Sequence, residues 1–180
     1  EAKEIAPWGK LLKSSQFWSL GLQFMITDYI MYVFLAWLPL YLMEVHGFSL
    51  SKMGLWAAAP WLSLMAVVSC CGYLSDKAIA AGFSQNLVKT STGAVGILLC
   101  ACTLFIATRT ADPMMNVFWL SVALGSLGLT MSASWSSVIS MGGRFAGSVS
   151  GWMNFWGNIG GVLAPSVTAW VATTYGWQAA

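Results

Sequence analysis

Residues 146–172 read AGSVSGWMNFWGNIGGVLAPSVTAWVA and contain no charged side chain. A helix that crosses the hydrocarbon core of a bilayer needs about 20 mostly apolar residues, so this stretch is long enough to span a membrane. Small and amide residues recur within it at steps of three and four, which places them on one helix face. This stripe consists of Gly151, Asn154, Asn158, Gly161 and Pro165.

Four further stretches have the same apolar character. Of the whole chain, 58% is hydrophobic and only 8% is charged, whereas soluble domains carry roughly 25% charged residues. The composition therefore predicts an all-α integral membrane protein in which residues 1–180 form a single transmembrane domain. The five predicted spans cover residues 17–43, 53–74, 87–108, 114–139 and 146–172.

Several classes of function find no support in the sequence. The net charge of +2 is too small to favour binding of a nucleic acid. No metal-ligand spacing, phosphate-binding loop or nucleophile–base set occurs, and the single histidine, His46, lies between two predicted spans. We therefore expect no enzymatic activity, no cofactor and no metal site.

The placement of Lys and Arg predicts the orientation in the membrane, because cytoplasmic loops carry an excess of both residues. If the amino terminus is cytoplasmic, six basic residues lie inside and only Lys52 and Arg109 lie outside. Five spans then place the carboxy terminus outside. The six inside residues are Lys3, Lys10, Lys13, Lys77, Lys89 and Arg144.

Asp28 is the only acidic residue deep inside a predicted span. A carboxylate at the centre of a bilayer costs about 2.5–3.5 kcal/mol on insertion scales, so it should face a cavity, find a partner or be protonated. Tyr32 lies one helical turn further on and could donate a hydrogen bond to it. Asp28 could couple transport to a proton or another cation, or it could be a neutral residue that packs its helix.

Other polar side chains inside the spans are candidates for binding a solute. An amide offers both a donor and an acceptor, and an indole ring can stack on a sugar or another ring-like solute. Hydroxyl and amide groups in membrane helices also form hydrogen bonds between helices, so packing remains an alternative. The candidates for substrate binding are Gln23, Ser132, Ser134, Trp135, Asn154 and Asn158.

Three segments carry a family resemblance. The first is GYLSDK at residues 72–77, in the predicted loop after the second span, where Asp76 could cap a neighbouring helix and Lys77 could approach an anionic leaflet. The second is WLPLYL at residues 37–42, and the third is residues 146–165. Together they resemble the anion:cation symporter branch of the major facilitator superfamily, with Gly72, Asp76 and Lys77 matching its loop signature.

The resemblance covers nearly the whole chain and implies a fold, an activity and partners. The five spans would correspond to helices seven to eleven of a facilitator-type transporter, so the chain would be a fragment without the amino-terminal half and the last helix. The implied activity is secondary transport of an organic anion such as a sugar acid, driven by protons in a bacterial inner membrane. The resemblance places Gln23, Ser132, Ser134, Trp135 and Asn154 near the substrate, and it gives Asp28 no role.

Two other readings stay open. A non-transporting membrane scaffold would bury Asn154 and Asn158 between helices without a cavity. A transporter would instead present Gln23, Trp135 and Asn154 on a broad open face. An intramembrane enzyme is a third alternative, but it would need a catalytic set that the spans lack. We also expect that this chain cannot transport a solute by itself.

Overall fold

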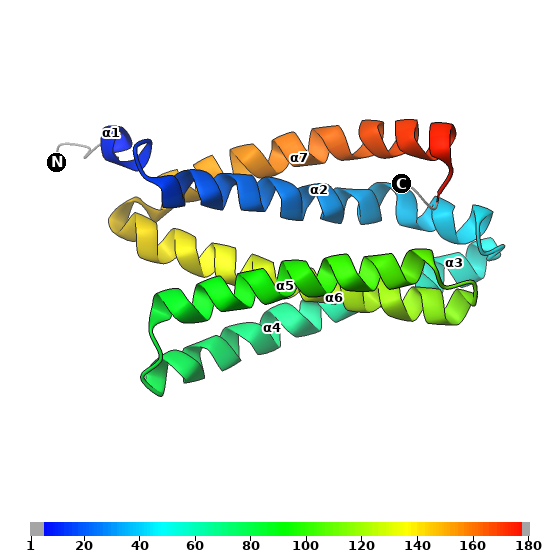
Figure 1. Ribbon diagram of the computed structural model, residues 1–180, viewed down its shortest axis with the longest axis horizontal. Helices are drawn as coiled ribbons and strands as arrows, with labels where there is room; N and C mark the ends of the chain where they lie inside the picture. The colour runs from blue at the N-terminus through cyan, green and yellow to red at the C-terminus, as the bar shows by residue number, and fades with distance from the viewer. Residues whose placement is uncertain (1–5, 178–180) are drawn as a thin grey trace.

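The computed structural model describes residues 6–177, and this part of the chain is entirely helical outside its turns. Five long helices run back and forth along the molecule (Figure 1), and two short helices precede the first and second of them. The elements are α1 (Trp8–Leu11), α2 (Ser15–Glu44), α3 (Leu50–Trp56), α4 (Ala58–Ala80), α5 (Gln85–Thr108), α6 (Pro113–Gly142), the 3-10 turn η1 (Gly143–Phe145) and α7 (Ala146–Tyr175).

The alternating directions of the helices separate the basic residues between the two ends of the bundle. One end carries α1, the α4–α5 connection and η1, on the left in Figure 1. We call this the basic end, because Lys10, Lys13, Lys77, Lys89 and Arg144 belong to its segments. Lys52 and Arg109 belong to segments at the opposite end.

Within residues 6–177, four segments are long and apolar enough to cross a membrane: Ser15–Glu44, Leu50–Ala80, Gln85–Thr108 and Pro113–Tyr175. The last contains 63 residues, which as one helix would be about 95 Å long against a hydrocarbon core of about 30 Å. The chain reverses inside it at Gly143, whose φ of 48° suits a residue without a side chain. The segment therefore consists of two antiparallel helices, α6 and α7.

Side-chain caps explain where three of the helices begin. Ser49 accepts a hydrogen bond from the backbone of Lys52, and Ser84 accepts one from Leu87. Asp112 accepts one from Met115 at 2.8 Å, with Pro113 in the first turn of α6. Each cap satisfies an amide that a helix start leaves without a partner, so these turns place the α2–α3, α4–α5 and α5–α6 connections.

The sequence predicted a loop at residues 72–77. This prediction is wrong, because α4 continues to Ala80. Gly72, Asp76 and Lys77 lie in the last turns of this helix, and the Lys77 ammonium sits 4.6 Å from the centre of the Tyr73 ring. The helix ends at Ala80, and Gly82 follows in the turn with a φ of 99°. Asp76 is exposed and caps no helix within the described residues.

The closest approach between helices occurs where α7 crosses α2. A Cβ atom added at Gly160 would collide with the backbone oxygen of Met25, and one at Gly157 would collide with the carboxyl of Asp28. Gly147 and Gly151 have nothing within 4 Å of such an atom. Only the glycines from 157 to 161 therefore form the packing seam, and the predicted stripe divides between this seam and an open face.

Replacing Gly160 by Ala is expected to destabilise the α2–α7 pair, because the added methyl group meets backbone that cannot rotate away. Overpacking of this kind costs about 1–3 kcal/mol. Gly151→Ala should be neutral or slightly stabilising, since Ala favours helix and the site is open. Thermal unfolding of the purified protein in detergent measures both, and equal midpoints for the two variants would contradict this packing.

Candidate functional site

A series of hydrogen bonds holds Gln23 of α2 against α6 and α5. The Gln23 amide nitrogen donates to the Ser134 hydroxyl at 3.3 Å, and Ser134 donates to the Thr130 carbonyl at 2.8 Å. The Thr130 hydroxyl in turn donates to the carbonyl of Gly93 on α5 at 3.1 Å. Three helices are therefore joined by polar contacts in a region where unpaired polar groups are costly.

The arrangement leaves part of the Gln23 amide available. The side chain is half-buried, and only its nitrogen takes part in a hydrogen bond among residues 6–177. The Thr27 hydroxyl donates to the Gln23 backbone carbonyl at 3.0 Å and does not touch the amide. The amide oxygen and the second N–H are thus free to meet a solute, while Ser134 fixes the orientation of the group.

The candidate residues of α6 divide between two faces of that helix. Ser134 is 1% exposed and is used in the contact with Gln23. Trp135 is 41% exposed, and its ring meets Phe24 of α2 edge-on, with centroids 6.1 Å apart. Ser132 lies three residues before Trp135, on nearly the same face, and is partly exposed. Trp135 and Ser132 are therefore accessible from outside the bundle, whereas Ser134 is buried and contacts Gln23.

Asn154 and Asn158 lie outside the seam between α7 and α2. The Asn154 nitrogen donates to the Ser150 carbonyl at 2.9 Å, and the Asn158 nitrogen donates to the Asn154 carbonyl at 2.7 Å. Both amides thus satisfy their nitrogens within α7. Asn154 is half-buried and Asn158 is exposed, so neither is enclosed between helices as the scaffold reading requires.

Asp28 lies inside the α2–α7 seam and is 7% exposed. Its carboxyl contacts Gly157, and its Oδ1 atom is buried without a hydrogen-bond partner. The hydrogen bond that Tyr32 could donate to Asp28 is not formed, and the Tyr32 ring lies against Gly161. No lysine or arginine pairs with Asp28 among residues 6–177. The carboxyl therefore sits in a tight, largely apolar contact between two helices.

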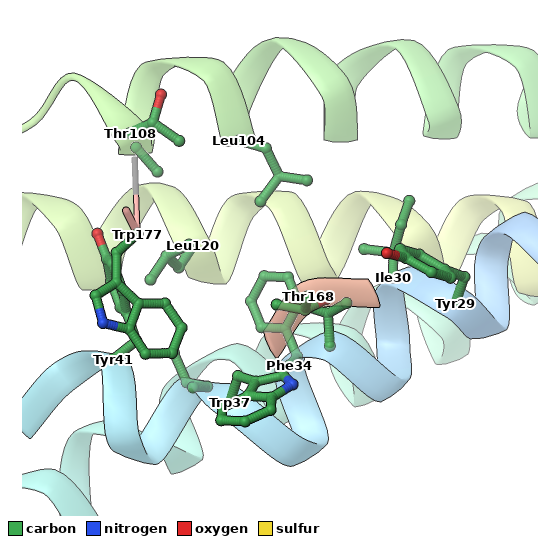
Figure 2. A pocket seen from close by; sticks show the side chains of 13 residues that line it. Tyr29, Ile30, Phe34, Trp37, Tyr41, Leu104, Thr108, Leu120, Thr168 and Trp177 are labelled. Carbon is green, nitrogen blue, oxygen red and sulfur yellow. The ribbon is translucent and has the colours of Figure 1, made fainter. Parts of the chain in front are cut away.

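An aromatic pocket near the opposite end of the bundle has a volume of about 220 Å³. Figure 2 shows rings from α2, including Trp37 and Tyr41, beside Trp177. The ring centroids of Trp37 and Trp177 are 5.9 Å apart, and the Trp37 Nε1 atom is buried without a partner. Residues 37–42, one of the three segments of the family resemblance, thus contribute Trp37, Leu38 and Tyr41 to this wall.

A buried asparagine at this end was not predicted. Asn116 of α6 is fully buried and donates to the Ala107 carbonyl at 2.8 Å and to the Tyr41 hydroxyl at 3.1 Å. The Tyr41 hydroxyl oxygen also lies 3.3 Å from the Nε2 atom of His46. Burial lowers the pKa of His46 from its ordinary value of 6.5, although Asn116 and Asp112 oppose that shift. Asn116 thus links α6 to α5 and α2.

A second unpredicted residue is Lys89, which the sequence suggested only as a cytoplasmic charge. Lys89 is 8% exposed, and its ammonium donates to the Ser136 carbonyl at 2.9 Å and to the Ser140 hydroxyl at 2.6 Å. The Lys89 side chain is therefore buried, and its ammonium lies against α6. Its position near the start of an apolar helix gave no signal of this burial.

The sequence of this chain matches a family model. Residues 1–165 match the model of the Major Facilitator Superfamily, which covers most of the chain. The chain belongs to the Major Facilitator Superfamily. The membrane-spanning helices and the absence of enzymatic activity expected from the sequence agree with this assignment, because the family consists of transporters.

Similar Major Facilitator Superfamily proteins transport anions. The chain is 31% identical over 168 residues to the probable sulfoacetate transporter SauU of Cupriavidus necator, covering 92% of this chain and 38% of that protein. It is 31% identical over 151 residues to the D-galactonate transporter of Escherichia coli O6:H1, covering 83% and 35%. It is 25% identical over 178 residues to the chloroplastic ascorbate transporter of Arabidopsis thaliana, covering 99% and 33%.

The chain spans about a third of the length of the curated relatives it matches, 33% for the chloroplastic relative above. These relatives come from bacteria and from chloroplasts. The chain is a multi-pass membrane segment about one third as long as these relatives.

Replacing Asn116 by Ala should destabilise the protein, because two buried hydrogen bonds to neighbouring helices are lost. Such a loss costs about 1–3 kcal/mol. Asn158→Ala is the matched control, since that amide is exposed and bonds only within its own helix. Chemical or thermal unfolding in detergent compares the variants, and an unchanged midpoint for Asn116→Ala would show that this link contributes nothing.

Proposed function

We propose that this chain is part of a proton-coupled secondary transporter for a small organic anion such as a sugar acid. The five long helices would correspond to helices seven to eleven of the whole transporter, and residues 1–180 would form one transmembrane domain. The substrate would bind near the middle of the membrane between this part and an amino-terminal half, and the two parts would rock to alternate access.

The observation that carries this proposal is the oriented amide of Gln23. The Ser134 hydroxyl holds one of its N–H groups at 3.3 Å and leaves its oxygen and other N–H free. An amide of this kind can donate to a carboxylate and accept from a hydroxyl of the same sugar acid. The galactonate and sulfoacetate transporters among the relatives support an organic anion as the substrate class.

The other candidates complete the proposed site from two helices. Trp135 would stack on the solute, and Ser132 would add a hydroxyl from the same face of α6. Asn154 would contribute its free amide oxygen from α7, with Asn158 one turn further on. A last helix and the amino-terminal half, outside this chain, would supply the remaining walls.

The proposed location is a bacterial inner membrane with the amino terminus in the cytoplasm. The gathering of five basic residues at one end of the bundle supports this orientation. Gly72, Asp76 and Lys77 would then lie at the cytoplasmic end of α4, with Lys77 directed at the anionic inner leaflet.

Ser134→Ala in the whole transporter should raise the KM for the anion several-fold, because Gln23 loses the contact that orients it. A net hydrogen bond contributes about 0.5–1.5 kcal/mol, which corresponds to roughly two- to twelvefold in affinity. Ser121→Ala is the matched control, since that hydroxyl donates only to the Val117 carbonyl of its own helix. Radiolabelled galactonate or sulfoacetate uptake into proteoliposomes measures KM, and equal values for both variants would refute the role of Ser134.

Asp28 is proposed as the proton carrier. The carboxyl is 7% exposed, lacks a cationic partner among the described residues and packs against Gly157 at the seam of α2 and α7. An ionised carboxylate there would be unfavourable. Loading and release of a proton would thus change how tightly the two helices pack.

Asp28→Asn should abolish uptake driven by a proton gradient and retain exchange of substrate across the membrane, because Asn resembles the protonated acid and cannot release a proton. Glu44→Gln serves as a control, because this carboxylate is exposed at the end of α2 and belongs to no proposed site. Gradient-driven uptake and counterflow are measured in the same proteoliposomes. Wild-type accumulation by Asp28→Asn would exclude Asp28 as the carrier.

A further inference from the structure

The turn between α2 and α3 carries the single histidine of the chain, His46, at the end of the bundle opposite the basic end (Figure 1). Gly47, with a φ of 64°, donates its N–H to the Met43 carbonyl at 3.1 Å, and Phe48 donates to the Leu42 carbonyl at 3.1 Å. Phe48 is 7% exposed and belongs to the apolar core. The backbone beside His46 is therefore fixed, and the imidazole is the part of the turn that can change partners.

Tyr41 connects His46 to α6 and α5 by hydrogen bonds. Its hydroxyl oxygen lies 3.3 Å from His46 Nε2 and accepts a hydrogen bond from Asn116 Nδ2 at 3.1 Å. An amide nitrogen can only donate, so the hydrogen of the Tyr41 hydroxyl is left for His46. A neutral imidazole accepts it at Nε2 and carries its own proton on Nδ1. In this state the hydrogen bonds run from His46 through Tyr41 and Asn116 to the Ala107 carbonyl of α5.

A protonated His46 cannot accept the Tyr41 hydrogen, because both of its ring nitrogens then donate. Asn116 offers it another partner, since the Oδ1 atom of this fully buried residue has no hydrogen-bond partner among the described residues. A side-chain contact with Asn116 and the negative charge of Asp112 both favour the protonated imidazole. Asp112 caps the start of α6. Protonation therefore draws the ring from Tyr41 of α2 toward the first turn of α6.

Asp112 is the charged group that acts on the imidazole of His46. The Glu44 carboxylate instead accepts a hydrogen bond from the Trp177 indole at 3.0 Å. Burial lowers the pKa of His46 from its ordinary value of 6.5, against the opposing effects of Asn116 and Asp112. The imidazole is therefore neutral at pH 7 and takes up a proton in a more acidic medium. The tyrosine and charged side chains described at this end of the bundle are Tyr41, Glu44, Lys52, Arg109, Asp112 and Tyr175.

We propose that His46 is a pH-responsive switch, which accepts a hydrogen bond from Tyr41 when neutral and turns to Asn116 Oδ1 and Asp112 when protonated. Acidification then moves the α2–α3 turn toward the start of α6 and releases the Tyr41 hydroxyl. The side of the membrane that is sensed rests on the proposed orientation, which places this turn outside. The switch itself involves neither Asp28 nor Gln23, so it is independent of the proposed transport chemistry.

Nitrogen NMR of the whole transporter, labelled at histidine and held in detergent, measures the tautomer and the titration of His46, whose signal is identified by its loss in His46→Gln. Neutral His46 should carry its proton on Nδ1, and Tyr41→Phe should remove this preference. The titration midpoint should lie below 6.5. Asp112→Asn should lower the midpoint further, because it removes the negative charge while Asn caps a helix as well as Asp does. A proton on Nε2 of neutral wild-type His46, or a midpoint that Asp112→Asn leaves unchanged, would overturn the proposal.

Spin labels on Ser51→Cys of α3 and Met114→Cys of α6 measure the accompanying movement, since both positions are exposed. The distance between the labels should shorten on acidification, with the midpoint that NMR gives for His46. The same labels in His46→Gln should keep the neutral-state distance at every pH, because an amide accepts from Tyr41 and cannot be protonated in this range. A wild-type distance that does not change with pH would contradict the switch, and so would the same change in His46→Gln.

Discussion

The hydrogen bonds from Gln23 through Ser134 and Thr130 to the carbonyl of Gly93 join α2, α6 and α5. In the hydrocarbon core water cannot satisfy these groups, so each needs a protein partner. These hydrogen bonds offset the free-energy cost of burying the Gln23 amide, and they also fix its direction. In the proposed site, packing and solute recognition would therefore depend on one set of bonds, because the position of α2 against α6 determines what the amide presents.

The rest of the bundle supports this arrangement from both sides. Helix α6 packs extensively against α5 and α4, and α7 packs against α2. Gly160 allows α7 to approach the Met25 backbone, and this approach places the Asp28 carboxyl against Gly157. A proton on Asp28 and a solute at Gln23 would therefore act on the same helix, α2. The proton would act at the seam of α2 with α7, and the solute would act at the contact of α2 with α6. In the proposed transporter, that shared helix would be the physical route for coupling.

Sequence reasoning was most successful where apolar length decides the structure. The predicted spans agree with the five long helices to within a few residues at most ends, because about 20 apolar residues have few alternatives in a membrane. It was wrong at residues 72–77, where local composition resembled a loop but α4 continues to Ala80. A helix can extend beyond the apolar core into the polar interface, and hydropathy does not mark where it stops.

The rotation of each helix about its own axis was harder to predict than its length. Helices that are apolar on all sides give a weak indication of which face is buried, so the stripe of α7 was expected to act together. In the structure Gly161 lies on α2 while Asn158 is exposed. The burial of Lys89 and Asn116 was not predicted, because it depends on neighbouring helices. Lys89 is held by Ser136 and Ser140 of α6. Asn116 is held by Tyr41 of α2.

The central claim is that Ser134 acts on the transported anion through Gln23. A double-mutant cycle tests it directly, with uptake measured for Gln23→Leu, Ser134→Ala and the combined variant of the whole transporter. If Ser134 acts only by orienting the amide, the combined variant should transport as Gln23→Leu does, with a coupling energy of about 0.5–3 kcal/mol. Losses that simply add would contradict the account, because each residue would then act on its own.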